Sequence, residues 1–386
     1  MIAREIPRDK PSICIVAHFA YGAISGGVTG HIGGVERQTT LMARWLAARG
    51  YQVTLLTWDE GQADGVVIDG VRLLKMCRRD AGIPGLRFLH PRWTSLNRAL
   101  HQADADLYYH NCGEYATGQV ALWCRRRGRK FVYSVANDPA VDPHLPDLPK
   151  IRERVLYRYG LRHADRVIVQ TQMQHQMLRS GFRLDSVVIP MPCPSTAAEE
   201  HQLPQPPSAD NVRILWIGRV CTQKRPDRLL ELATLCPEWR FDLVGPGGQD
   251  DYSRQVLEQA KSITNVTVHG GVKRERVPEF YRRSACLCCT SDYEGFPNTF
   301  LEAWSHGLPA VSTFDPDRLI ASHRMGAVAD DINGLASGIR GLLDSPERWR
   351  EASANARGYY LDNHTVERAM PRFEQVFLDM YRQDAT

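Results

Sequence analysis

Short apolar runs alternate with segments of helical periodicity along most of the chain, and this alternation limits the fold more than any other feature. In the first half the apolar runs are Ser12–His18, Gln52–Trp58, Asp106–Cys112, Lys130–Ala136 and Arg166–Thr171. In the second half they are Val212–Ile217, Phe241–Val244, Val266–His269, Cys286–Thr290 and Leu308–Ser312. Strands that alternate with helices, such as the helical pattern from Val35 to Gly50, predict parallel sheets with helices on both faces.

A proline-rich, polar segment interrupts this alternation between Met191 and Asn211, and the strand–helix pattern begins again after it. With 386 residues, of which 43% are hydrophobic, the chain is long enough for two cores. We therefore predict an α/β protein with two Rossmann-like, doubly wound domains that face each other across a cleft, where open sheets of this kind bind ligands. The predicted parts are domains 1–192 and 212–364, the linker 193–211, and a C-terminal segment 365–386 whose amphipathic helix Val366–Arg382 packs across a domain boundary.

Charge, cysteine usage and hydropathy exclude several classes of protein. The formal net charge of +4 is too small for a nucleic-acid binder that works by broad phosphate neutralisation. The ten cysteines lack a paired CxxC pattern, and the crowded Cys286–Cys289 is typical of a buried strand rather than a metal site, so we expect a reducing cytoplasm. No apolar stretch reaches the roughly 18 residues of a membrane span, and the N-terminus lacks a leader pattern.

The sharpest chemical signal is the segment Ser291–Ala303, which directly follows a predicted buried strand. It carries Glu294 before Gly295 and Pro297, so this carboxylate lies in the loop that precedes a helix, whereas Glu302 lies one turn inside the helix. Asn298 is the expected N-cap and Gly307 the expected stop. A lone glutamate at such a place is more often a capping or exposed residue. Beside a phosphate held by the helix amides, however, these carboxylates would accept hydrogen bonds from sugar and ribose hydroxyls.

Two cations follow another predicted strand at the same edge of the second sheet. Gly218-Arg219 comes directly after this strand, and Lys224 precedes the next helix. Arg219 can fork onto phosphate oxygens while Lys224 acts as a point charge, and together they could neutralise a diphosphate. Each alone would be read as a solvated basic residue near a turn, but with the two glutamates they form a set that favours a ligand site.

With these motifs the chain resembles, over nearly its whole length, the retaining glycosyltransferases of family 4, which share the GT-B architecture. The resemblance is carried by Gly33-Gly34-Val35-Glu36-Arg37, by Gly218-Arg219 with Lys224, by Val244-Gly245-Pro246-Gly247, by Gly271-Val272 and, most specifically, by Glu294-Gly295-Phe296-Pro297 with Glu302. It implies a hexosyltransferase that uses a nucleotide-diphosphate sugar as its donor and needs no cofactor.

The resemblance also implies a role for each matching position. Glu294 is expected to bind hydroxyls of the donor sugar, Glu302 those of the ribose, and Arg219 and Lys224 the diphosphate. The other donor-binding positions implied are Gly33, Gly34, Gly218, Gly245, Val272, Lys273, Gly295, Phe296, Pro297, Asn298 and Thr299. Paired cations and helix-end amides can stabilise the leaving diphosphate, and no Asp-x-Asp tripeptide follows a strand in the first half, so we expect metal independence. In such enzymes the leaving phosphate is thought to take the acceptor's proton.

One position departs from the family pattern. Where the family has a histidine after the strand Lys130–Ala136, this chain has Asn137 followed by Asp138. We assign Asn137 to the catalytic set, although an amide cannot shuttle a proton at pH 7. On the acceptor side we place Asp138 together with His110, Asn111 and Glu114, which are equally well described as polar loop residues.

Basic segments at 125–130 and 152–162 would suit an anionic membrane surface, although a solvated helix face explains them at least as well. Because many family members act on polyprenyl-diphosphate carriers, we expect a glycan or lipid-linked acceptor and a cytoplasmic enzyme at the inner face of the membrane. Two alternatives stay open: a GT-B nucleotide-sugar epimerase, which would react with the donor alone, and an inactive partner subunit. A dehydrogenase is disfavoured because the glycines at 245–248 lack the dinucleotide spacing.

Overall fold

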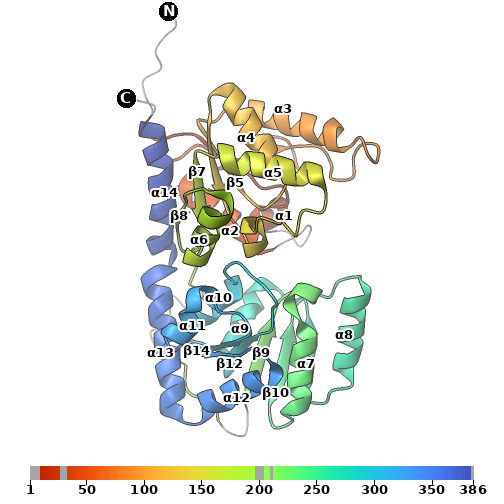
Figure 1. Cartoon of the computed structure of the whole chain (residues 1–386), viewed down its shortest axis with the longest axis vertical. Helices are drawn as coiled ribbons and strands as arrows, with labels where there is room; N and C mark the ends of the chain where they lie inside the picture. Colours follow the sequence, from red (N-terminus) through yellow and green to blue (C-terminus); the bar gives the residue numbers. More distant parts are fainter. Residues whose placement is uncertain (1–8, 27–32, 196–203, 209–211, 384–386) are drawn as a thin grey trace, which may run out of the picture. The chain divides into compact units, whose positions relative to one another are not determined.

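In the computed structural model, residues 9–26, 33–195, 204–208 and 212–383 are described. The chain divides into two units, each with its own sheet (Figure 1). The first unit comprises Met1–Met191 with Ala369–Thr386, and the second comprises Pro192–Arg368. The cleft between the two domains stays a prediction.

The first unit contains an eight-stranded sheet among its described residues, with strand order β3-β4-β2-β1-β5-β6-β7-β8. Its strands are β1 (Ile13–Val16), β2 (Val53–Thr57), β3 (Val67–Ile68), β4 (Val71–Lys75), β5 (Leu107–Asn111), β6 (Lys130–Ser134), β7 (Arg166–Val169) and β8 (Val187–Val188). All neighbouring pairs are parallel except β3 and β4. The predicted parallel sheet is therefore confirmed. The sequence patterns missed β4 and the two-residue strands β3 and β8, which are too short to show a periodicity.

The helices of the first unit are α1 (Tyr21–Ser25), α2 (Gly34–Ala48), α3 (Thr94–Ala103), α4 (Ala116–Arg127), α5 (Ile151–His163), α6 (Gln172–Phe182) and most of α14 (Val366–Arg382). Helix α1 lies between β1 and α2, and residues 27–32 after it lie outside the described residues. This short helix ends because Gly26 adopts a left-handed conformation with φ 67°.

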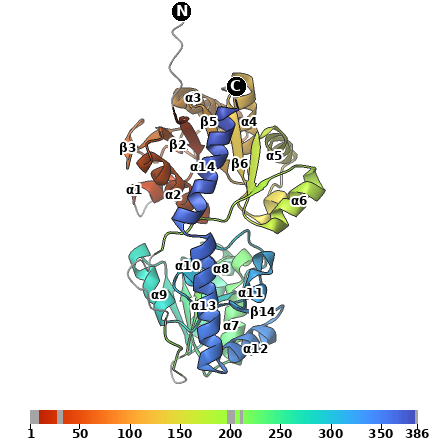
Figure 2. The same ribbon diagram turned by 90° about the vertical axis from the view of Figure 1, so that its left-hand side faces the viewer.

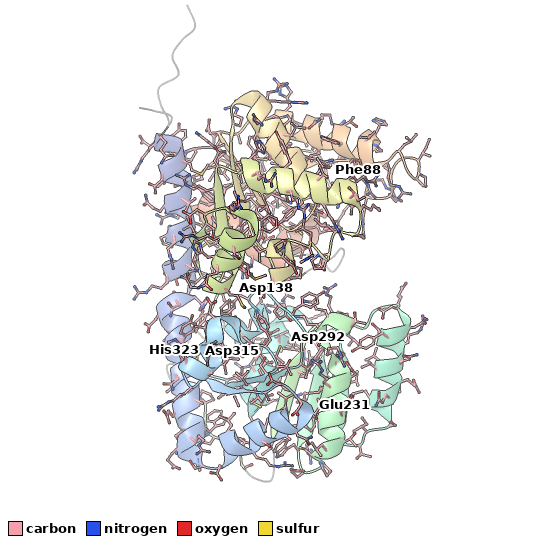
Figure 3. The ribbon with its side chains drawn as sticks, viewed as in Figure 1. Phe88, Asp138, Glu231, Asp292, Asp315 and His323 are labelled. Carbon is pink, nitrogen blue, oxygen red and sulfur yellow. The ribbon has the colours of Figure 1, made fainter. Side chains whose placement is uncertain are left out.

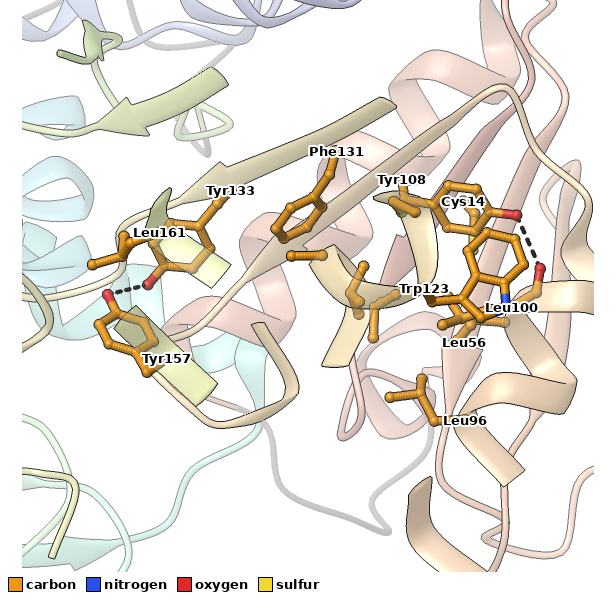
Figure 4. Packing of buried hydrophobic residues seen from close by; sticks show 14 of the residues in the cluster. Cys14, Leu56, Leu96, Leu100, Tyr108, Trp123, Phe131, Tyr133, Tyr157 and Leu161 are labelled. Atoms are coloured by element: carbon orange, nitrogen blue, oxygen red, sulfur yellow. Dashed lines mark hydrogen bonds between the residues drawn. The ribbon is translucent and has the colours of Figure 1, made fainter. Parts of the chain in front are cut away.

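Buried tyrosines contribute much of the core on one face of the first sheet (Figure 4). The Tyr108 hydroxyl donates to the carbonyl of Leu100 at 2.9 Å, and the hydroxyls of Tyr133 and Tyr157 are 2.8 Å apart. These bonds satisfy hydroxyl groups that would otherwise be costly to bury. They tie β5 to α3 and β6 to α5, and the polar residues of interest follow these two strands.

Helix α14 lies along the other face of the first sheet (Figure 2). The ring of Phe377 meets that of Tyr109 edge-on, with centroids 5.9 Å apart. The Glu374 carboxylate accepts a hydrogen bond from the Tyr51 hydroxyl at 2.8 Å. The bounds of this helix are those predicted from its amphipathic pattern.

The second unit contains, in its described part, a six-stranded parallel sheet with the order β11-β10-β9-β12-β13-β14. Its strands are β9 (Arg213–Ile217), β10 (Arg240–Val244), β11 (Val266–Gly270), β12 (Cys286–Cys289), β13 (Ala310–Ser312) and β14 (Gly326–Val328). Its helices are α7 (Pro226–Leu235), α8 (Asp251–Lys261), α9 (Val277–Arg283), α10 (Asn298–Ser305), α11 (Leu319–Ser322), α12 (Ile332–Leu343) and α13 (Pro346–Asn363). The strand order reverses between β9 and β12, and such a switch point leaves a crevice at the carboxyl ends of the two strands.

Three predictions about composition can be compared with the structure. Strand β12 is fully buried, as the Cys286–Cys289 pattern predicted. All ten cysteines are free, and the described residues hold no cluster of histidine, cysteine or acidic side chains suited to a metal ion. No described helix combines the length and the apolar character needed to cross a membrane.

Candidate active site

The loop after β12 carries the first carboxylate of the predicted set. Glu294 is 7% exposed, and Gly295, Phe296 and Pro297 beside it are also buried. The predicted N-cap was wrong by one residue, because Pro297 with ψ 118° occupies that place and Asn298 begins α10. Gly307, with φ 66°, follows the end of the helix as predicted. The buried loop thus delivers Glu294 to the edge of the sheet rather than to solvent.

Lys224 forms an ion pair with Glu294 across the switch point. It lies in a helical turn, Thr222–Lys224, between β9 and α7. Trp216 Nε1–H donates to Thr290 Oγ1 at 2.9 Å, and the Thr290 hydroxyl in turn donates to the carbonyl of Lys224 at 2.8 Å. This chain of bonds holds the turn after β9 against the end of β12. Both side chains are mostly buried, so their attraction is screened less than that of a surface pair.

Glu302 is held by two residues that the sequence analysis did not select. Its Oε1 lies 2.6 Å from Arg274 Nη1, and its Oε2 accepts a hydrogen bond from the Tyr281 hydroxyl at 2.9 Å. The Tyr281 ring stacks on that of His306 at 5.5 Å. Burial, assisted by the nearby charges of Arg282, Arg357 and Arg274, lowers the pKa of His306 to about 4. Glu302 is therefore a positioned, ion-paired carboxylate before any ligand arrives.

Two predicted glycines bring the backbones of β9 and β10 into close contact. Gly245 has φ 143°, and a Cβ atom at this position would lie 1.7 Å from the carbonyl oxygen of Gly218. Only glycine fits there.

Phe296, another predicted donor position, packs edge-on against Trp304, so its side chain belongs to the core. The predicted contact with the donor therefore concerns the backbone amide of Phe296.

Arg219 is the exposed member of the predicted set and makes no hydrogen bond or ion pair with any described residue. Val272 and Lys273 follow β11, where Lys273 is exposed and Val272 half-buried. The acidic neighbour Asp292, labelled in Figure 3, lies 2.8 Å from Arg228 Nη2. The structure thus groups Glu294 with Lys224, pairs Glu302 with Arg274 and Tyr281, and leaves Arg219 exposed, without a polar partner among the described residues.

In the first unit, Asn137 and Asp138 follow β6 as predicted, but each contacts a different partner. The Asn137 amide lies 3.4 Å from an Asp147 carboxylate oxygen, and Asp138 accepts a hydrogen bond from the Gln174 side chain at 2.9 Å. At the start of α2, the Glu36 carboxylate accepts the Gly33 N–H at 2.9 Å, and Gly34 is the first helical residue. The turn that precedes α2 falls partly outside the described residues.

Two histidines, His18 and His110, lie close to the Glu114 carboxylate near the carboxyl ends of β1 and β5. His18 Nδ1 lies 2.8 Å and His110 Nε2 3.6 Å from Glu114 Oε1. Burial raises the pKa of the Glu114 carboxyl, but the two imidazoles outweigh burial and lower that pKa to about 2. The Nε2 atoms of both histidines and Oδ1 of Asn111 are buried without a hydrogen-bond partner among the described residues. The structure thus brings His110 and Glu114 together as the sequence suggested and adds His18, which the sequence analysis missed.

Two family models match the chain in tandem. The glycosyl transferase 4-like domain matches residues 33–192, and the glycosyl transferases group 1 domain matches residues 199–359. The chain belongs to the GT-B glycosyltransferases. Together the two models cover most of the sequence, including the whole second sheet and the first sheet apart from β1.

Curated relatives of this GT-B glycosyltransferase are distant. The amylovoran biosynthesis glycosyltransferase AmsD of Erwinia amylovora is 29% identical over 42% of this chain and 46% of its own length. The D-inositol 3-phosphate glycosyltransferase of Xylanimonas cellulosilytica is 24% identical over 80% of each chain. The match covers only about half the length of several of these relatives. For a glycosyltransferase of Haemophilus influenzae, for example, it covers 59% of that protein.

Solved structures share the fold of this GT-B glycosyltransferase. Sucrose-phosphate synthase from Thermosynechococcus elongatus superimposes with a TM-score of 0.78 at 19% identity, over 97% of this chain and all of the other. Anabaena HepE, solved in complex with UDP and glucose, gives a TM-score of 0.74 at 17% identity over 95% and 99%.

Proposed function

We propose that this GT-B protein is a retaining, metal-independent glycosyltransferase that moves a hexose-type sugar from a nucleotide-diphosphate donor to a glycan or lipid-linked acceptor. The observation that carries the proposal is the mostly buried Lys224–Glu294 pair, together with the exposed Arg219, which has no ion-pair partner among the described residues. The three side chains follow β9 and β12, between which the strand order reverses. Such an arrangement offers positive charge for a diphosphate and a carboxylate for hydroxyls at one crevice.

Each residue of the second unit receives a role. Arg219 and Lys224 bind the diphosphate and stabilise the charge that develops on it as the glycosidic bond to the nucleotide breaks. Once phosphate oxygens neutralise Lys224, Glu294 can accept hydrogen bonds from hydroxyls of the donor sugar. Glu302, oriented by Arg274 and Tyr281, accepts the ribose hydroxyls on the remaining lone pairs of its oxygens.

The remaining steps of the mechanism are assigned by analogy with the family. The departing phosphate accepts the proton of the acceptor hydroxyl, while the new glycosidic bond forms on the face that the diphosphate leaves. Asn137, which stands where the family has histidine, donates a hydrogen bond from its amide and does not carry a proton. The acceptor side is assigned to the first unit, with His110, Asn111, Glu114 and Asp138.

The relatives suggest a biological context. One relative is the amylovoran biosynthesis glycosyltransferase named above. Another, from Escherichia coli, is a lipopolysaccharide 1,6-galactosyltransferase that is 27% identical over 152 residues. We infer an acceptor of the same kind, a growing surface glycan, and an enzyme at the inner face of the cytoplasmic membrane. The free thiols throughout the chain are consistent with a reducing compartment.

A thermal-shift screen against UDP, GDP, ADP and CDP and their sugars tests the donor site. UDP comes first because HepE was solved with it. We expect one nucleotide to raise the Tm by mass action, and its sugar to be consumed only when an acceptor is added. Consumption of the donor alone would indicate an epimerase instead.

Glu294→Gln provides the matching variant. It should retain the fold and lose transfer, whereas Glu258→Gln on the exposed face of α8 should behave as the wild type. Full activity in Glu294→Gln, or no shift with any nucleotide, would contradict the proposal.

A further inference from the structure

The segment between β4 and α3 contains three arginines that no carboxylate neutralises. Arg79, Arg87 and Arg92 line a hollow of about 470 Å³ together with Asp80. Asp80 is paired with Arg78, 3.6 Å away, and among the described residues none of the three lining arginines has an acidic partner. This hollow, called the arginine hollow below, therefore concentrates positive charge that no ion pair with a described acidic residue balances.

Contacts within the first unit hold two of the three guanidinium groups, those of Arg79 and Arg92. Arg92 Nη2 donates to the carbonyl of Arg79 at 2.8 Å, while Arg92 Nε is buried without a hydrogen-bond partner in the described structure. Arg79 lies over the ring of Phe19 at 5.1 Å, and the Arg87 guanidinium contacts no described polar group. Ordered guanidinium groups with free N–H donors match the geometry of phosphate oxygens.

Exposed aliphatic side chains occur in the same segment of the chain as these arginines. Ile83, Leu86 and Leu89 are 69%, 61% and 57% exposed, and they alternate with the arginines in one short segment. The segment is tied to α5 by Phe88, labelled in Figure 3, whose ring lies under the Arg152 guanidinium at 4.5 Å. Helix α5 adds Ile151, which is 79% exposed. Single exposed aliphatic residues are ordinary, but a group of them beside unbalanced arginines is typical of a surface for an amphipathic anion.

We propose that the arginine hollow binds the phosphate or diphosphate group of an amphipathic lipid whose hydrocarbon chain lies over Ile83, Leu86 and Leu89. The charge and the hydrogen-bond donors select the head group, and the exposed aliphatic surface selects the chain. The inference rests on the proposed function only in that this lipid is taken to be the acceptor of the sugar. The hollow is built from other residues than those assigned above to either substrate.

The test measures binding directly and requires no turnover. The full chain carrying Arg219→Ala and Lys224→Ala serves as the background, so that the donor site does not compete for the probes. Its affinities for inorganic pyrophosphate and for monomeric farnesyl diphosphate are measured by calorimetry. We expect farnesyl diphosphate to bind at least about tenfold more tightly, because its chain buries apolar surface.

Matched variants separate the two parts of the site. Arg79→Gln with Arg87→Gln should weaken both probes about 25-fold, or about fivefold for each arginine. Arg72→Gln with Arg98→Gln removes the same charge from exposed positions outside the hollow and should change either affinity less than twofold. Leu86→Ser with Leu89→Ser should lower the affinity for farnesyl diphosphate to that for pyrophosphate and leave pyrophosphate unchanged. The control for the two leucine changes is Val67→Ser, because the Val67 side chain is 62% exposed and lies outside this segment.

Two results would overturn the proposal. Equal losses in the two arginine pairs would mean that the overall charge, and not the hollow, attracts the anion. Equal affinities for the two probes, with no effect of the leucine changes, would leave an anion site without a lipid. The proposed function fails separately, because absence of a UDP shift in the otherwise unmodified chain would leave the farnesyl diphosphate result unaffected.

Discussion

The two units treat their charged groups in opposite ways. In the second unit, Glu294 is paired with Lys224, and Glu302 with Arg274 and Tyr281. In the first unit, the lining arginines of the arginine hollow lack acidic partners, and His18 and His110 keep buried Nε2 atoms without a hydrogen bond to the described residues. The two glutamates of the second unit are thus paired within the described structure, whereas the arginine hollow of the first unit has no acidic partner there.

This contrast follows from the cost of burial. A carboxylate that is more than nine-tenths buried, as Glu294 and Glu302 are, must be paired, because an isolated buried charge is strongly destabilising. An arginine at the surface can stay hydrated until an anion arrives, and a neutral imidazole costs far less to bury than a charge. Pairing in advance also fixes geometry, which suits a site that must stabilise a transition state.

Removal of the buried cation should produce the largest effect. Lys224→Ala leaves Glu294 without its partner and removes positive charge from the departing diphosphate. We expect the transfer rate to fall by at least about 100-fold, measured as nucleotide release in the presence of acceptor. Lys261→Ala, an exposed lysine on α8 paired with Glu258, is the matched control and should leave the rate unchanged. A rate within threefold of the wild type in Lys224→Ala would remove this lysine from the site.

The stability of the second unit should depend on pH through His306. Its folded pKa of about 4 lies below the value of about 6.5 in an unfolded chain, so the unfolded state binds more protons between these values. Stability is therefore full above pH 6.5 and falls as the pH drops toward 4, by about 2 kcal/mol between pH 7.5 and 5.

Urea unfolding at the two pH values measures this dependence. His306→Gln, which cannot charge, should reduce the difference by about that amount. Identical pH dependences in the two proteins would show that the histidine is not held neutral by its surroundings.

The unpaired guanidinium of the second unit should affect binding without affecting folding. Arg219 is exposed and makes no described polar contact, so Arg219→Gln removes no interaction of the free protein. We expect the affinity for the nucleotide diphosphate to fall about tenfold while the Tm without ligand is unchanged. Arg240→Gln, an exposed arginine on β10, serves as the control. A lowered Tm together with unchanged affinity would assign Arg219 a structural role instead.

The sequence predicted the second unit's site best where the determinants are local. Buried β12, the loop with Gly295 and Pro297, and the helix after it are consecutive, so their order alone brings Glu294 to the sheet edge. The switch point then brings Lys224 beside it, since both strands end at the same edge. The N-cap error at Asn298 also has a local reason, because Pro297 already has the extended conformation that a cap requires.

The parts that could not be predicted depend on tertiary contacts between distant segments. Arg274 lies after β11 and Tyr281 in α9, and nothing in either segment indicates that both turn toward Glu302. His18 lies just beyond β1, and its partner Glu114 follows β5, nearly a hundred residues later in the sequence. Hydrophobic periodicity identifies elements but does not specify which polar side chains meet once the elements pack.

The smallest expected effect concerns Glu114 in the first unit. Two substitutions there distinguish the contribution of its negative charge from that of its hydrogen-bonding oxygen. Glu114→Gln keeps an oxygen for the His18 Nδ1–H but removes the charge that both imidazoles face, whereas Glu114→Ala removes the oxygen as well. Because a neutral acceptor forms a weaker hydrogen bond, we expect Glu114→Gln to lower kcat/KM for the acceptor about fivefold. Glu114→Ala should lower it further, and neither change should alter the affinity for the nucleotide. A parallel loss of nucleotide affinity would contradict this assignment of Glu114 to the acceptor, since the side chains assigned above to the donor (Arg219, Lys224, Glu294 and Glu302) lie in the second unit.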